Sequence, residues 1–179
     1  MLKRILSEKK DVIVKQWRRR IVGTYPADSS HFLSDKMDQF ANPIGAAIRN
    51  ETEVLFDALI DNKPDAIAPS LDKIIRIRAV QEFTPAQAVS FVYMLKDVIR
   101  EELSEELSQI EMAHALSEFE PNIDRMALIG FDLYSMCRDQ MASIKVNEAH
   151  RRTARLVDML NARGKTKTTE PDNNENENK

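Results

Sequence analysis

Cysteine and glycine are scarce in this chain, which has one cysteine and four glycines among 179 residues. A single cysteine excludes an intramolecular disulfide framework and a metal site built from several cysteines. The Asn-Gly and Asp-Gly pairs that commonly join paired strands are absent. No stretch approaches the roughly 20 apolar residues of a membrane span, and the N-terminus does not have the pattern of a signal peptide. We therefore expect no membrane span and a cytoplasmic location.

Residues that favour helices fill the sequence instead, and 42% of all residues are hydrophobic. The fold class predicted from this composition is all-α, and the length fits one domain. The net charge of -3 argues against a nucleic-acid partner. A local basic run, Arg18 to Arg20, could contact phosphate or an anionic membrane, but a solvated helix face is the preferred interpretation.

The N-terminal half divides into helices at its glycine and proline residues. Ser7 is expected to cap a helix that ends near Val22, before the break at Gly23. A second helical region is expected over about 33–60, interrupted at Asn42-Pro43. The prolines in DNKPDAIAPS predict a loop over 61–70, followed by a helix over about 70–80.

The strongest helix signal begins at Thr84, which can cap a helix whose first position is Pro85. The apolar residues that follow have the 3, 4, 7 and 8 spacing of one helix face. They are Ala88, Phe91, Val92, Leu95, Val98, Ile99 and Leu103.

A long helix is predicted near the C-terminus, after a separate acidic helical piece that ends at Pro121. It extends over about 122–162, which is about 60 Å at 1.5 Å per residue. Its second half has apolar or small residues in alternating steps of three and four, which indicates a short coiled-coil seam and an interface between two protomers. The predicted interface residues are Val146, Ala149, Thr153, Leu156 and Leu160. The domain is thus expected over 1–162, and the polar residues 163–179 are expected to be a disordered tail.

Four stretches resemble the RsbRD N-terminal family, the sensor-like N-terminal domain of RsbT co-antagonist proteins in bacterial stress signalling. They are VIVKQWRRRIVGTYP, FANPIGAAIRNETEVLFDAL, LDKIIRIRAVQEFTPAQAVSFVYMLKDVIREEL and FDLYSMCRDQMASIKVNEAHRR. The resemblance covers about residues 8–160. It implies a globin-like helical bundle without haem that forms a homodimer. Co-antagonists carry a STAS domain after this region, and the sequence leaves no room for one, so a stand-alone regulatory subunit is expected.

Candidate sites for a cofactor, a metal or catalysis are weak. Of His31, His114 and His150, only His114 has apolar neighbours that could suit a haem ligand, and we expect no haem. The acidic run at 101–106 is more typical of a solvated face than of a metal site. No nucleophile or phosphate-loop motif is present, so catalysis is not expected. Cys137 lies in the apolar phase of its helix and is interpreted as a core residue.

Arg78 is the most informative polar residue, because it follows Ile74 and Ile75 at helical spacing and adjoins the apolar face. A buried guanidinium needs a partner. We expect it to pair with a carboxylate, to cap a helix end or to meet an anionic ligand, for which Phe91 and Tyr93 are candidate pocket residues. The carboxylate candidates are Glu82, Asp97 and Glu101.

These observations favour a non-enzymatic signalling or regulatory domain that acts through a protein partner, which the sequence does not name. Two alternatives stay open. One is a sensor that binds haem or another small ligand, and the other is a scaffold subunit of a larger complex.

Overall fold

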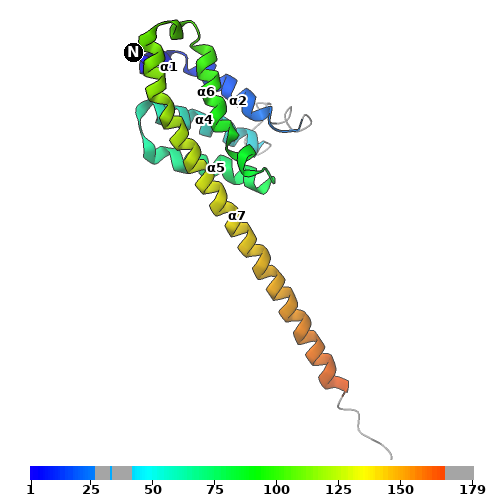
Figure 1. The fold of residues 1–179 in the computed structure, drawn as a ribbon. Coiled ribbons are helices and arrows are strands. Elements are labelled where there is room, and N and C mark those ends of the chain that lie inside the picture. The colour runs from blue at the N-terminus through cyan, green and yellow to red at the C-terminus, as the bar shows by residue number, and fades with distance from the viewer. Residues whose placement is uncertain (27–32, 34–41, 168–179) are drawn as a thin grey trace, which may run out of the picture. The chain divides into compact units, whose positions relative to one another are not determined.

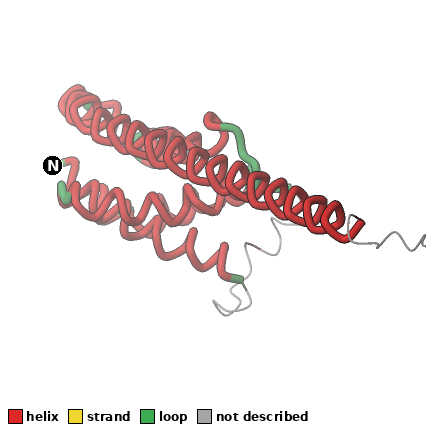
Figure 2. The backbone as a smooth tube through the Cα atoms, turned by 90° about the horizontal axis from the view of Figure 1, so that it is seen from below, coloured by secondary structure: helices red, strands yellow, loops and turns green. Residues whose placement is uncertain are grey.

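The computed structural model describes residues 1–26, 33 and 42–167. These residues form six α-helices and one short 3₁₀ helix, without a strand (Figures 1 and 2). The all-α class is therefore confirmed, whereas the globin-like arrangement stays a prediction. The chain divides into two compact units, 1–138 and 139–179, which are described separately below.

The N-terminal segment forms two helices rather than one, α1 (Leu2–Glu8) and α2 (Lys10–Val22). The prediction that Ser7 caps a helix is wrong. The Ser7 hydroxyl donates to the carbonyl of Lys3 at 2.9 Å, so it lies inside α1. A serine can bond back to the preceding turn in this way, and sequence spacing does not distinguish this from a cap.

Helix α4 (Pro43–Asp61) begins at the predicted interruption, because the buried Asn42 side chain caps it by accepting from the Gly45 N–H at 2.8 Å. Helix α5 (Pro64–Val80) begins earlier than expected, so the predicted loop over 61–70 is wrong. The break between the two helices is confined to Asn62 and Lys63, where Asn62 takes the left-handed conformation. Pro64 suits the first position of a helix, and Pro69 lies inside α5.

Helix α6 (Pro85–Glu102) matches the prediction, including the cap by Thr84. After the 3₁₀ helix η1 (Glu106–Ser108), helix α7 (Ile110–Lys167) continues through Pro121, so the predicted break at Pro121 is wrong. An ion pair at the residue before Pro121 holds α7 against α6. Arg100 donates to both carboxylate oxygens of Glu120, at 2.6 and 2.8 Å.

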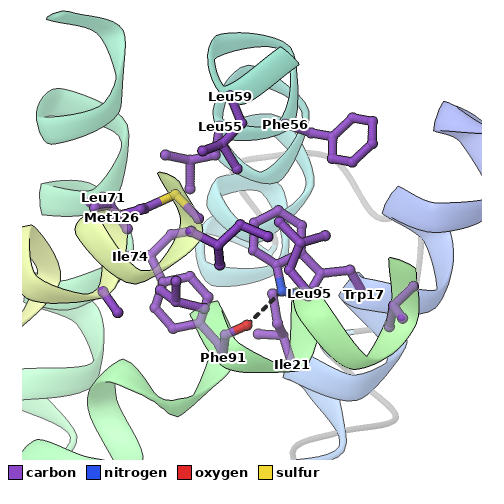
Figure 3. Packing of buried hydrophobic residues seen from close by; sticks show 14 of the residues in the cluster. Trp17, Ile21, Leu55, Phe56, Leu59, Leu71, Ile74, Phe91, Leu95 and Met126 are labelled. Carbon is purple, nitrogen blue, oxygen red and sulfur yellow. Dashed lines mark hydrogen bonds between the residues drawn. The ribbon is translucent and has the colours of Figure 1, made fainter. Parts of the chain in front are cut away.

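The core of the first unit contains side chains from α1, α2, α4, α5, α6 and the first part of α7. Trp17 is fully buried, donates from Nε1 to the Phe91 carbonyl at 2.6 Å, and stacks on the Phe91 ring with centroids 6.2 Å apart (Figure 3). Burial of a large apolar side chain contributes roughly 1.5–3 kcal/mol. This contact joins α2 to α6, and α4 packs along α5.

The described part of the second unit is helical as far as Lys167. Most of its side chains are exposed over 139–162. The remainder of the predicted tail, 168–179, lies outside the described residues. Among the helices that the structure describes, none is long and apolar enough to cross a membrane.

Candidate functional site

The candidate site lies in the first unit, where three segments converge on Arg78. Thr84 and Gln87 form a capping box, in which each side chain accepts from the backbone N–H of the other residue. The Phe83 N–H donates to the Arg78 carbonyl at 3.2 Å, and Tyr134 Oη donates to the Phe83 carbonyl at 2.5 Å. These bonds fix the corner between α5 and α6 and position Phe83 beside Arg78.

The guanidinium of Arg78 is fully buried and enclosed by three aromatic rings. Its Cζ atom lies 4.4 Å from the ring centroid of Phe83, 5.3 Å from that of Tyr25 and 5.5 Å from that of Phe91. Ring faces are negative and attract a cation, by on the order of 0.5–2 kcal/mol for each contact. The arrangement is an aromatic enclosure, which we define as Tyr25, Phe83 and Phe91 around Arg78.

The predicted carboxylate partner of Arg78 is not found. Nη2 donates instead to Thr24 Oγ1 at 2.8 Å and to the Gln87 carbonyl at 3.3 Å. Within the described residues no ion pair joins Arg78 to an acid, and one candidate, Glu101, pairs with Arg20. The ring faces and neutral oxygens stabilise the cation in place of a carboxylate.

Some hydrogen-bonding capacity stays unused in the enclosure. Nε and Nη1 of Arg78 and the hydroxyl of Tyr25 are buried and have no hydrogen-bond partner among the residues that the structure describes. Burial lowers the pKa of Arg78 and raises the pKa of Tyr25, while the charge of Arg78 acts to lower the pKa of Tyr25. None of the described pockets is lined by Arg78 or by the three rings, so the predicted ligand site at Arg78 stays a prediction.

Of the two predicted pocket residues, the structure brings only Phe91 to Arg78. Tyr93 is 47% exposed, and its ring lies 6.0 Å from Lys96 Nζ. Two residues apart on a helix are separated by about 200°, so Phe91 and Tyr93 face different sides. Tyr25 and Phe83, which also lie beside Arg78, were not predicted from the sequence as site residues. The sequence does carry a signal for Phe83, because an apolar residue just before a helix cap often packs back onto that helix.

The other candidate residues lie apart from this enclosure. His31 is outside the described residues, His150 is exposed, and the His114 side chain is 71% exposed beside Glu118. Cys137 is buried in the core. No group of three metal-ligating side chains occurs among the residues described. In the acidic run, Glu106 pairs with Lys9 at 2.7 Å.

The predicted interface residues are all exposed in the second unit. Val146, Leu156 and Leu160 are the large ones, and Ala149 and Thr153 are also exposed. We call these five residues the seam. Apolar side chains on a helix surface at this spacing are typical of a coiled-coil face.

Comparison with known proteins identifies the family. A family model described as RsbT co-antagonist protein rsbRD N-terminal domain matches residues 11–149. The chain belongs to this family. The comparisons with curated proteins and with solved structures gave no match.

Membership in the RsbRD N-terminal family places the chain among the regulatory domains of bacterial stress signalling. The match contains the whole aromatic enclosure. It also contains Val146 and Ala149, and it ends before Thr153, Leu156 and Leu160. The second half of the seam is therefore a feature of this chain that the family match does not cover.

Proposed function

We propose that this RsbRD N-terminal domain is a non-enzymatic regulatory module that works as a homodimer, paired through the seam. The observation that carries the proposal is the exposure of Val146, Leu156 and Leu160 at heptad spacing. Burying one Leu side chain contributes roughly 1.5–3 kcal/mol. Two copies that pair through these residues would remove them from water on both helices.

A second copy of the chain is the occupant that fits the seam best. In a parallel pair each seam residue meets its own counterpart, so the apolar stripe is complementary to itself. Val157 and Met159 flank the C-terminal end of the stripe and are also exposed. Arg152 also flanks the stripe and forms an ion pair with Glu148 on its own helix at 2.5 Å. This ion pair reduces the repulsion between the Arg152 side chains of the two copies.

In this proposal a signal shifts the population between two arrangements of the dimer, and a partner protein binds one of them more tightly. The unused donors at Arg78 support a site for such a signal. The domain performs no catalysis and needs no cofactor. Exposure of His114 and His150 counts against the alternative of a haem sensor, because an axial histidine points into an apolar pocket.

Analytical ultracentrifugation of the full chain tests the homodimer. The wild type should sediment as a dimer at micromolar concentration, and Leu156→Glu should raise the dissociation constant at least about tenfold, since the substitution places a carboxylate in the apolar stripe of both copies. Arg151→Glu is the matched control, because residue 151 lies on the opposite side of the helix from the seam. A wild type that stays monomeric, or a Leu156→Glu variant that dimerises normally, would overturn the proposal.

Purification of the native protein separates the regulatory module from its two alternatives. Mass spectrometry should find a sub-stoichiometric protein partner that is lost with the Leu156→Glu variant. A fixed-stoichiometry complex that survives this substitution would indicate a scaffold subunit. A haem absorbance band lost in His114→Ala would indicate the haem sensor.

A further inference from the structure

A second feature of the first unit is a pocket of ≈ 470 Å³ lined by α2, α4 and Leu33. Its buried apolar lining comes from Leu33 and Ile48, with half-buried Val22 beside them. Its size falls in the range of pockets that bind small organic ligands. None of the residues of the aromatic enclosure lines it.

The apolar side of the pocket is held in place by a buried amide. The Asn42 side chain is fully buried, accepts from the Gly45 N–H at 2.8 Å and donates to the Leu33 carbonyl at 3.4 Å. A Cβ atom at Gly45 would lie 2.7 Å from the Leu33 carbonyl oxygen. Glycine therefore permits Leu33 to approach α4 closely.

Four cationic side chains also line the pocket: Lys15, Arg18, Arg19 and Arg49. Arg18 is fixed to α4, because it pairs with Glu53 at 2.8 Å and donates to Thr52 Oγ1 at 2.8 Å.

Lys15 and Arg19 differ from Arg18, because neither makes an ion pair or hydrogen bond within the part of the chain that the structure describes. They lie four residues apart on α2, so two like charges face the same side of the helix. Such a pair is unfavourable by itself by about 0.2–0.5 kcal/mol. An anion placed between Lys15 and Arg19 would convert this repulsion into attraction.

We propose that this pocket binds an amphiphilic anion with a single alkyl chain and a carboxylate or phosphate head. The head lies between Lys15 and Arg19, and the chain lies mainly along Val22 and the CH₂ groups of Arg18, since Leu33 and Ile48 are only 5% and 2% exposed. An apolar chain gains affinity from this lining in proportion to the area it buries, which a bare inorganic anion does not. The site binds its ligand whether or not the seam pairs two copies, so this proposal does not depend on the homodimer.

Isothermal titration calorimetry of the full chain tests the ligand class with defined probes. Dodecanoate and dodecyl phosphate should each bind at one site per chain, and the tighter of the two identifies the head that the pocket prefers. Octanoate should bind at least about tenfold more weakly than dodecanoate, because each buried CH₂ contributes about 0.8 kcal/mol. Dodecyltrimethylammonium, which reverses the head charge, and inorganic phosphate, which lacks the chain, should not bind.

A double variant, Lys15→Gln with Arg19→Gln, tests the position of the head. It should lower dodecanoate affinity about tenfold or more, since two charge-assisted contacts are lost. Both side chains are exposed, so the variant should keep its circular dichroism spectrum. Arg138→Gln with Lys145→Gln removes the same charge from exposed positions of α7 and should leave affinity unchanged. The proposal is overturned if dodecanoate does not bind below about 1 mM, if dodecyltrimethylammonium binds equally well, or if the Lys15 and Arg19 double variant binds like the wild type.

Discussion

Trp17 in the first unit and Leu156 in the second both belong to the apolar stripe of a helix, yet Trp17 is fully buried and Leu156 is 60% exposed. Helices α2 and α6 cover each other in the first unit, through the contact between Trp17 and Phe91. In the second unit the helix has no other described element to pack on. The difference shows that periodicity defines which face of a helix is apolar, but not what covers that face.

The largest expected effect comes from removing a buried ring in the first unit. Trp17→Ala should lower the free energy of unfolding by about 3–5 kcal/mol, because it leaves a cavity and removes the bond to the Phe91 carbonyl. Leu156→Ala should change it by less than about 0.5 kcal/mol at a concentration where the chain is monomeric. Urea unfolding followed by circular dichroism measures both. Equal losses for the two variants would show that the second unit also has a core.

Arg78 and Arg152 allow the same comparison, between a buried and an exposed position, for charged side chains. Arg78→Ala should destabilise the first unit by about 2–4 kcal/mol, since it empties the aromatic enclosure. Arg78→Met fills most of the same volume without unused donors and should change stability by less than about 1 kcal/mol. Arg152→Met, at an exposed residue of the second unit, should be close to neutral. The same urea titrations provide the measurement.

A different result for Arg78→Met would be informative about function. If Met is as destabilising as Ala, the positive charge itself is required at this position. The contacts of the cation with the three rings and the Nη2 hydrogen bonds to Thr24 and Gln87 would then be the source of the stability.

Thr84 in the first unit and Thr153 in the second allow a comparison of the two units in which smaller changes in stability are expected. The Thr84 hydroxyl accepts from the Gln87 N–H at the start of α6, so Thr84→Ala should cost about 1 kcal/mol. The Thr153 hydroxyl donates to the Ala149 carbonyl in the middle of α7. Thr153→Ala should therefore raise local helix stability by a few tenths of a kcal/mol. Thermal unfolding measures the first effect and far-ultraviolet circular dichroism the second, and a loss of stability in Thr153→Ala would contradict this explanation.

Local signals explain the parts of the fold that the sequence predicted well. The cap at Thr84 and the first position at Pro85 depend on residues within one turn, so α6 was placed correctly. Pro69 and Pro121 were misread as breaks. A proline removes one backbone hydrogen bond, and contacts with other helices, such as Arg100 with Glu120, decide whether the helix continues.

The candidate site was less predictable for the same reason. The position of Arg78 beside the apolar face followed from its spacing after Ile74 and Ile75. Its partners Thr24 and Tyr25 come from a distant segment that the sequence marked only as a helix break. Long-range contacts of this kind are set by the packing of α2 against α6, which helical periodicity does not specify.

The smallest expected effect concerns an exposed carboxylate of the first unit. Asp61 pairs with Lys3 at 2.9 Å and Lys63 at 3.0 Å, and hydrogen bonds from these two lysines lower its pKa from 3.8. A group whose pKa is lowered on folding stabilises the protein above its unfolded pKa, and this contribution is lost as the pH falls through the folded value. Asp61→Asn should thus slightly lower the urea midpoint at neutral pH, and the difference from wild type should shrink as the pH falls below 3.8 and through the lowered folded pKa of Asp61. Glu148→Gln, which removes an exposed pair from the second unit, should leave the midpoint unchanged at both pH values. A difference between wild type and Asp61→Asn that persists in acid would show that the asparagine acts through something other than lost charge.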